Sequence, residues 1–198
     1  MPSNLPIQVF TYWLLVLTSL FATASYANPP PDNDIDVSVQ VSGDIVTVDL
    51  NMLVPAARQQ VWAVLTDFDH MADFVTNLTE SKIASVLNGT MIVSQRGSAH
   101  FGPLSFDFNS MREIRLAAYN QIQSHLISGN MRKLDGVTRL QDEGEQTRVV
   151  YHSESIPGTW LPPVVGKNFI EHEIRGQYAQ IRNEVVKRKS LNLQLPRS

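Results

Sequence analysis

The chain contains no cysteine. It can therefore form no disulfide, carry no lipid on a cysteine and offer no thiol as a nucleophile or metal ligand. Whatever fold the sequence adopts depends on a packed apolar core alone.

The chain also has no excess of positive charge. Its 198 residues include 16 Lys and Arg against 19 Asp and Glu, for a formal net charge of −3 at pH 7. Proteins that neutralise the phosphates of nucleic acids have the opposite balance, so nucleic-acid binding is disfavoured.

Motifs of catalysis and metal binding are equally scarce. There is no Gly-x-Ser-x-Gly and no glycine-rich phosphate loop. The histidines lack metal-binding spacing, and Glu171-His172-Glu173 is interpreted as a solvated helix face. We therefore expect no metal, no cofactor and no catalytic residue identifiable from a motif.

The first 27 residues resemble a secretory signal. Val9 to Ala24 is apolar and uncharged, and Ser25-Tyr26-Ala27 suits cleavage after Ala27. The run is shorter than the ~20 residues that a membrane-spanning helix needs. However, Met1 to Gln8 lacks the Lys or Arg that usually opens a signal peptide, so an uncleaved anchor remains the alternative. Secretion across the inner membrane would lead to the periplasm in a Gram-negative bacterium. The predicted organisation is a signal at 1–27, a Pro-rich linker at 28–35, one domain at 36–190 and a tail at 191–198.

Apolar residues alternate with polar ones from Ile35 to Leu50, which predicts a strand, or a hairpin broken at Ser42-Gly43-Asp44. Val54 to Val75 then changes to helical spacing and predicts two short helices. In the first helix Trp62 is expected to point inward. Asp67 or Asp69 is expected to cap the second.

Short turns separate the strands expected after these helices, which favours antiparallel pairing. The expected strands are Lys82 to Leu87, Met91 to Ala99, Leu104 to Arg115, Gln121 to Ser128, Arg132 to Gln141 and Thr147 to Ile156. A helix from about Pro163 to Lys189 follows, with an apolar stripe. The predicted fold is α+β: a curved antiparallel sheet of about seven strands that grips a long C-terminal helix, with a cavity between them.

The stretch from Val54 to Leu78, which includes Val61-Trp62-Ala63-Val64-Leu65-Thr66-Asp67-Phe68, resembles the opening of the START-like (SRPBCC) helix-grip superfamily. The likeness is to its polyketide cyclase/dehydrase and coenzyme Q-binding branch, and Gln95-Arg96-Gly97 and Arg148 to Tyr151 look similar too. One departure is Val137-Thr138-Arg139, where many relatives place a Trp. The resemblance implies that the cavity binds a lipid, an isoprenoid quinone or a polyketide-like molecule.

The predicted binding site lies where the sheet meets the terminal helix, because apolar residues on one face of a strand there meet apolar residues on successive turns of the helix. Its residues are Phe106, Phe108, Arg112, Trp160, Ile170, Ile174 and Tyr178. Trp160 is either a gate at the cavity mouth or a plug in the core.

Arg112 has the strand parity of Phe106 and Phe108 and so faces the apolar side. Its partner is either a ligand carboxylate or phosphate, or a protein carboxylate such as Glu154, unless it reaches water at the open edge. His152 and Glu154 alternate like an acid/base pair but are expected to face solvent.

Two functions remain open. The first is a secreted carrier that binds a hydrophobic small molecule without catalysis and contacts a membrane transiently when the ligand is transferred. The alternative is an aromatase or cyclase, in which Arg112 and a nearby Tyr or His would orient and deprotonate a polyketide-like substrate. The signal-like segment counts against the enzyme, because polyketide assembly is cytoplasmic.

The signal prediction can be checked by mass. We expect the intact mass of the mature protein to correspond to a chain beginning at Asn28. A mature cytosolic product that retains Met1 would contradict it.

Overall fold

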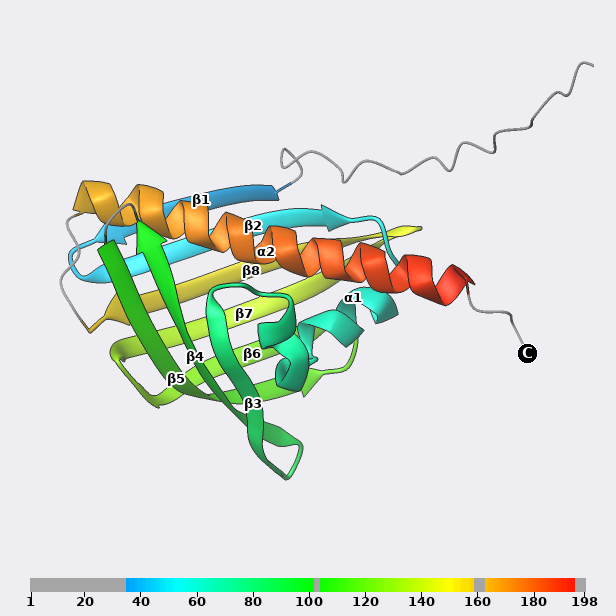
Figure 1. Cartoon of the computed structure of the whole chain (residues 1–198), viewed down its shortest axis with the longest axis horizontal. Helices are drawn as coiled ribbons and strands as arrows, with labels where there is room; N and C mark the ends of the chain where they lie inside the picture. The colour runs from blue at the N-terminus through cyan, green and yellow to red at the C-terminus, as the bar shows by residue number, and fades with distance from the viewer. Residues whose placement is uncertain (1–34, 102–103, 159–162, 195–198) are drawn as a thin grey trace, which may run out of the picture.

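The computed structural model describes residues 35–101, 104–158 and 163–194 (Figure 1). The predicted signal segment and Trp160 lie outside these residues. The described chain forms one curved antiparallel sheet, two short helices and one long helix, as the sequence predicts.

The sheet has eight strands in the order β1-β2-β8-β7-β6-β5-β4-β3. Their bounds are β1 Ile35–Ser42, β2 Ile45–Val54, β3 Leu78–Leu87, β4 Thr90–Phe101, β5 Leu104–Ala117, β6 Gln121–Gly129, β7 Met131–Glu143 and β8 Gln146–Pro157. The count exceeds the prediction by one because the stretch from Ile35 to Leu50 is a hairpin. Gly43, with φ of +62°, makes the left-handed turn between its strands.

The two short helices carry the chain from the interior strand β2 to the opposite sheet edge at β3 (Figure 1). The first is α1 (Arg58–Leu65), which buries Val61, Val64 and Leu65 against the core. Trp62 packs against the core as expected but is only half-buried. The buried face is centred on Val61, Val64 and Leu65, and Trp62 lies at its margin, where its ring meets the edge of Tyr119.

The second short helix, the 3-10 helix η2 (Phe68–Asp73), has no side-chain cap. Asp67 instead accepts hydrogen bonds from His70 Nδ1 and Arg188 Nη1, both at 2.7 Å. Asp69 accepts the backbone N–H of Ile83, also at 2.7 Å. The capping prediction is therefore wrong, because both carboxylates connect η2 to neighbouring groups rather than to its own free amides.

The long helix α2 (Pro163–Gln194) crosses the concave face of the sheet and ends five residues beyond the predicted Lys189 (Figure 1). No Gly or Pro follows Lys189 before Pro196, so nothing in the sequence stops the helix earlier. Four of its apolar residues are buried along its length: Phe169, Tyr178, Ile181 and Val185 are 6%, 8%, 7% and 1% exposed.

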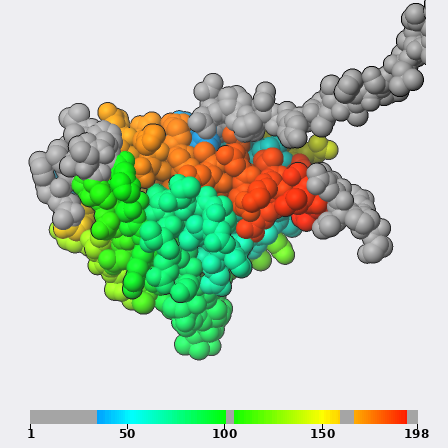
Figure 2. All heavy atoms as spheres, in the orientation of Figure 1, coloured from blue at the N-terminus to red at the C-terminus, as the bar shows by residue number. Residues whose placement is uncertain are grey.

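Polar contacts hold the C-terminal half of α2 to the rest of the fold. Arg188 bonds Asp67, and Lys189 Nζ donates to the carbonyl of Pro55 at 2.6 Å. Gln180 exchanges hydrogen bonds with Thr76, at 2.8 Å and 2.9 Å. Figure 2 shows this end of α2, in red, seated against the teal segment that contains η2. In the described part of the chain, no helix combines the length and hydrophobicity that crossing a membrane requires.

Strand β4 passes close to the loop before β3. At Gly97 an added Cβ would lie 2.0 Å from the carbonyl oxygen of Asn77 and 2.6 Å from the Phe108 ring. The N–H of Ser98 donates to that same Asn77 carbonyl at 3.0 Å. Only glycine therefore fits at position 97.

This close approach predicts opposite outcomes for two glycine substitutions. Gly97→Ala should lower the free energy of unfolding by roughly 1–3 kcal/mol or more, because the backbone of Asn77 has to move. Gly176→Ala, on α2 with nothing within 4 Å of the new methyl group, should raise it by up to about 1 kcal/mol through helix propensity. Urea melts of both variants measure the difference. Equal effects would show that the approach at Gly97 is not tight.

Candidate ligand-binding cavity

A cavity of about 400 Å³ lies between the concave face of the sheet and α2. Strands β2 and β4 to β8 form its floor, and the segment from α1 to β3 closes one side with Leu65, Phe68 and Met71. Its volume falls within the range of pockets that enclose small organic molecules.

The cavity exists because α2 does not follow the curvature of the sheet along its whole length. The stripe residues Tyr178, Ile181 and Val185 are buried, whereas Ile174 and Ile170, one and two turns before Tyr178, are only half-buried and line the cavity. The space opens where the helix leaves the sheet.

The structure brings six of the seven predicted site residues together around this space; the seventh, Trp160, lies outside the described residues. The six are Phe106, Phe108, Arg112, Ile170, Ile174 and Tyr178. Phe169, which the sequence analysis did not select, also lines the wall, with its ring centroid 5.3 Å from that of Phe106. Phe169 directly precedes Ile170 in the sequence, and an aromatic residue beside a predicted wall residue was the signal that could have identified it.

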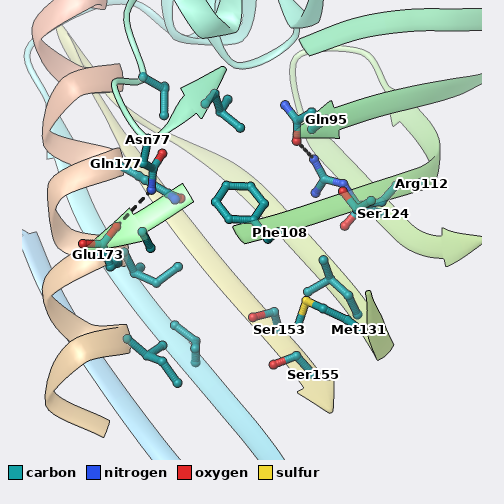
Figure 3. Close-up of a pocket in the computed structure, with 18 of the residues that line it drawn as sticks. Asn77, Gln95, Phe108, Arg112, Ser124, Met131, Ser153, Ser155, Glu173 and Gln177 are labelled. Carbon is teal, nitrogen blue, oxygen red and sulfur yellow. Dashed lines mark hydrogen bonds between the residues drawn. The ribbon is translucent and has the colours of Figure 1, made fainter. Parts of the chain in front are cut away.

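Arg112, on β5, faces the cavity as its strand parity predicts (Figure 3). The prediction left its partner open, and the structure assigns one: Nη2 donates to the side-chain oxygen of Gln95 on β4. Glu154 is not a partner, because it lies on the outer face and accepts from Lys133 Nζ at 2.8 Å. His152 also lies outside and bonds Asp49 at 2.7 Å, so both residues face solvent as expected.

Gln95 is 6% exposed and was missed by the sequence analysis. Its amide nitrogen donates to Ser81 Oγ at 2.9 Å and lies 3.4 Å from the sulfur of Met71. These contacts fix the amide so that its oxygen points at Arg112. The Nε of Arg112 is buried and has no hydrogen-bond partner among the described residues.

Two tyrosines lie near Arg112, with ring centroids 5.5 Å apart: Tyr151 on β8 and Tyr178 on α2. Burial raises the pKa of Tyr151 above its ordinary value and raises the pKa of Tyr178 well above it. Both phenols are therefore protonated at neutral pH. Gly136 leaves room for Tyr151 and Ser124, because a Cβ there would lie 3.3 Å from the Tyr151 ring and 2.9 Å from Ser124 Oγ.

A second polar group lies across the cavity from Arg112, with Phe108 between them (Figure 3). Here Asn77 Nδ2 donates to Glu173 Oε2 at 3.1 Å. Glu173 therefore lines the cavity and is not part of a purely solvated face, so that interpretation of Glu171 to Glu173 is wrong for this residue. Its spacing of three from Ile170 places it on the same side of the helix.

The cavity is open at one rim, where Asp107, Asn109 and Asn130 line it and are exposed. Asn130 joins the strands there: its Oδ1 accepts from the N–H of Asn109 at 3.0 Å, and its Nδ2 donates to the carbonyl of Asp107 at 2.7 Å. The described residues contain no group of three or more potential metal ligands, at this rim or elsewhere.

Comparison with solved structures identifies the same fold in other proteins. A STAR-related lipid transfer protein from Xanthomonas axonopodis aligns with a TM-score of 0.62 and 15% identity over 77% of this chain and 93% of that one. Human StAR-related lipid transfer protein 5 gives 0.62 and 14% over 78% and 83%. The Zhui aromatase/cyclase of a Streptomyces species gives 0.57 and 18% over 73% and 95%. At these identities the likeness concerns the fold alone.

No curated protein matches the chain by sequence. The sequence profile of one family does match, over residues 54–182, about two thirds of the chain. That span begins just before α1 and ends within α2, so it includes most of the cavity wall. The chain belongs to the polyketide cyclase/dehydrase and lipid transport family and has the START-like helix-grip fold.

Proposed function

We propose that this protein binds and carries a hydrophobic small molecule, such as a lipid, an isoprenoid quinone or a polyketide-like compound, without changing it chemically. The observation that carries the proposal is the cavity of about 400 Å³ walled by Phe106, Phe108, Ile170 and Ile174. An apolar ligand gains about 25 cal/mol for each Å² of its surface removed from water. Burial alone can therefore supply the affinity, after the cost of association is met.

The arrangement of titratable groups favours a carrier over a cyclase. A cyclase needs a base that is unprotonated at neutral pH and within reach of the substrate. The described lining contains no histidine, and both cavity phenols are protonated because burial raises their pKa. Its carboxylates are Asp107, at the exposed rim, and Glu173, which accepts from Asn77.

The proposal places this binding outside the cytoplasm, on the basis of the apolar segment before Ala27. A carrier in that compartment would collect or deliver its ligand through transient contact with a membrane. A bilayer is where such apolar molecules reside when no protein encloses them.

The protonated state of the cavity phenols can be measured by the ultraviolet absorbance of phenolate as pH rises. We expect one phenol to ionise only well above the ordinary value of about 10, and Tyr178→Phe to remove that step. Tyr119→Phe, which removes an exposed phenol, should leave it in place. Because the fold favours the neutral form, its contribution to stability is complete below pH 10 and is lost as pH rises through the folded-state pKa. Ionisation of all described tyrosines near pH 10 in the folded protein would refute it.

Filling the cavity tests the proposed function directly. Ile174→Trp places an indole in the space where α2 leaves the sheet, so it should abolish uptake of the ligand that co-purifies from the source compartment. The fold should persist, since Ile174 is only half-buried and the space beside it is empty. Mass spectrometry of solvent extracts measures the ligand, and circular dichroism measures the fold.

The matched control is His172→Trp, which adds the same side chain to an exposed position of the same helix. This variant should retain ligand. If folded Ile174→Trp retains it equally, the binding site is elsewhere and the carrier proposal fails.

A further inference from the structure

Arg112 is a part-buried cation without a counter-ion among the described residues, and its Nε is fully buried. It makes no ion pair with any residue that the structure describes, and its one hydrogen-bond acceptor is the neutral amide of Gln95. The groups that interact with it electrostatically are the phenols of Tyr151 and Tyr178, not a carboxylate. Arginine stays protonated in proteins, so a positive charge persists inside the cavity.

Such a charge is costly unless it is paired, and here one buried donor, Nε, has no partner at all. The sequence does not avoid this cost, although a neutral residue at position 112 would. Gln95 is itself held by Ser81 and Met71, which keeps the guanidinium in one orientation. The arrangement holds an unsatisfied cation ready for a group that the protein does not supply.

Other donors surround the same place. Ser124, on β6, lies beside Arg112 in the cavity wall (Figure 3). Its Oγ and the Tyr151 hydroxyl lie 2.9 Å and 3.4 Å from the position that a Cβ of residue 136 would take, so Gly136 leaves both accessible. We call Arg112, Ser124 and Tyr151 the donor cluster. A guanidinium, a hydroxyl and a protonated phenol together suit the oxygens of an anion.

The donor cluster lies at the inner end of the cavity. Arg112 pairs in the sheet with Val93, which is fully buried, and precedes Ile114, which is 1% exposed. The exposed rim at Asp107, Asn109 and Asn130 lies further back along β5 and at the β6–β7 turn. A head group bound by the cluster would therefore enter first, and the apolar part would extend past Phe108 and Phe106 toward the rim.

We propose that the ligand is an apolar molecule with a single anionic head, a carboxylate or a phosphate, which binds the donor cluster with its chain directed toward the rim. This inference rests on the proposed function and specifies its ligand class. It goes beyond hydrophobic binding because it requires the head group to be charged and to lie deepest in the protein.

Three probes of equal chain length test the head group: dodecanoic acid, dodecyl phosphate and dodecanol, each titrated calorimetrically into the purified protein at neutral pH. One or both anions should bind about 10- to 100-fold tighter than the alcohol, the range for a hydrogen bond to a charged group. The tighter of the two anions identifies the head. This comparison needs no variant and so does not depend on whether a substituted chain folds.

Variants then assign the preference to Arg112. Arg112→Met should bind anion and alcohol equally, and Arg112→Lys, which keeps the charge, should retain part of the preference. Arg115→Met is the matched control, because Arg115 lies on the same strand but is exposed and pairs with Glu113. It should behave like the parent.

The outcomes separate the two proposals. If all three probes bind the parent equally, the anionic head is refuted while the proposed function stands. If the preference persists in Arg112→Met, the donor cluster is not the head-group site. If no probe binds, the proposed function fails and the inference with it.

Discussion

One helix has to cover the concave face of an eight-stranded sheet, and the rest of the structure follows from that constraint. A sheet of this size is twisted and curved, whereas an α-helix is close to straight. The two surfaces can be in close contact along only part of their length. In this protein Val185, in the C-terminal half of α2, is 1% exposed, and the cavity lies beside Ile170 and Ile174, which are half-buried.

The contacts that hold α2 are concentrated where it packs closely. Arg188 bridges Asp67 and Glu184, at 2.7 Å and 2.8 Å, and Lys189 reaches the carbonyl of Pro55. These bonds, with the apolar stripe beneath them, stabilise the α1–α2 end of the fold. Ile170 and Ile174, nearer the N-terminus of α2, are half-buried beside the cavity, whereas Phe169 next to them is 6% exposed. The polar contacts of Arg188 and Lys189 lie outside the cavity lining, so a ligand can occupy the cavity without replacing them.

The donor cluster is the one place in the described cavity where the usual rule for buried charge is broken. Buried cations are normally paired with carboxylates. Even the more accessible Lys133, on the outer face of the same sheet, pairs with Glu154. Arg112 instead has a fixed amide for a neighbour and one nitrogen without a partner. Sites that depart from the rules of packing and charge pairing in an otherwise consistent fold are typically functional. Gln95 matters here because it orients the cation without neutralising it.

The order and type of the elements were determined by the sequence alone, because they depend on local periodicity and turn residues. Apolar residues that alternate with polar ones predicted the strands, and apolar residues three and four apart predicted α1 and α2. Short polar breaks between the strands indicated antiparallel pairing. The same periodicities placed Phe106, Phe108, Arg112, Ile170, Ile174 and Tyr178 on the surfaces that meet around the cavity. Local spacing did not determine how deeply Trp62 is buried. The centre of a helix's buried face depends on the residues that the helix packs against.

Only the tertiary structure decided which polar groups meet. Gln95 joins Arg112 through strand pairing between β4 and β5, and Glu173 joins Asn77 from a segment that is 96 residues away in the sequence. Such pairs depend on register, on the path of α2 and on where the helix leaves the sheet, none of which local spacing encodes. The residues that shape the ligand's surroundings, Gln95, Ser124 and Gly136 among them, are ordinary strand residues in the sequence. They become a site because strand pairing and the path of α2 place them around one cavity or directly beside it.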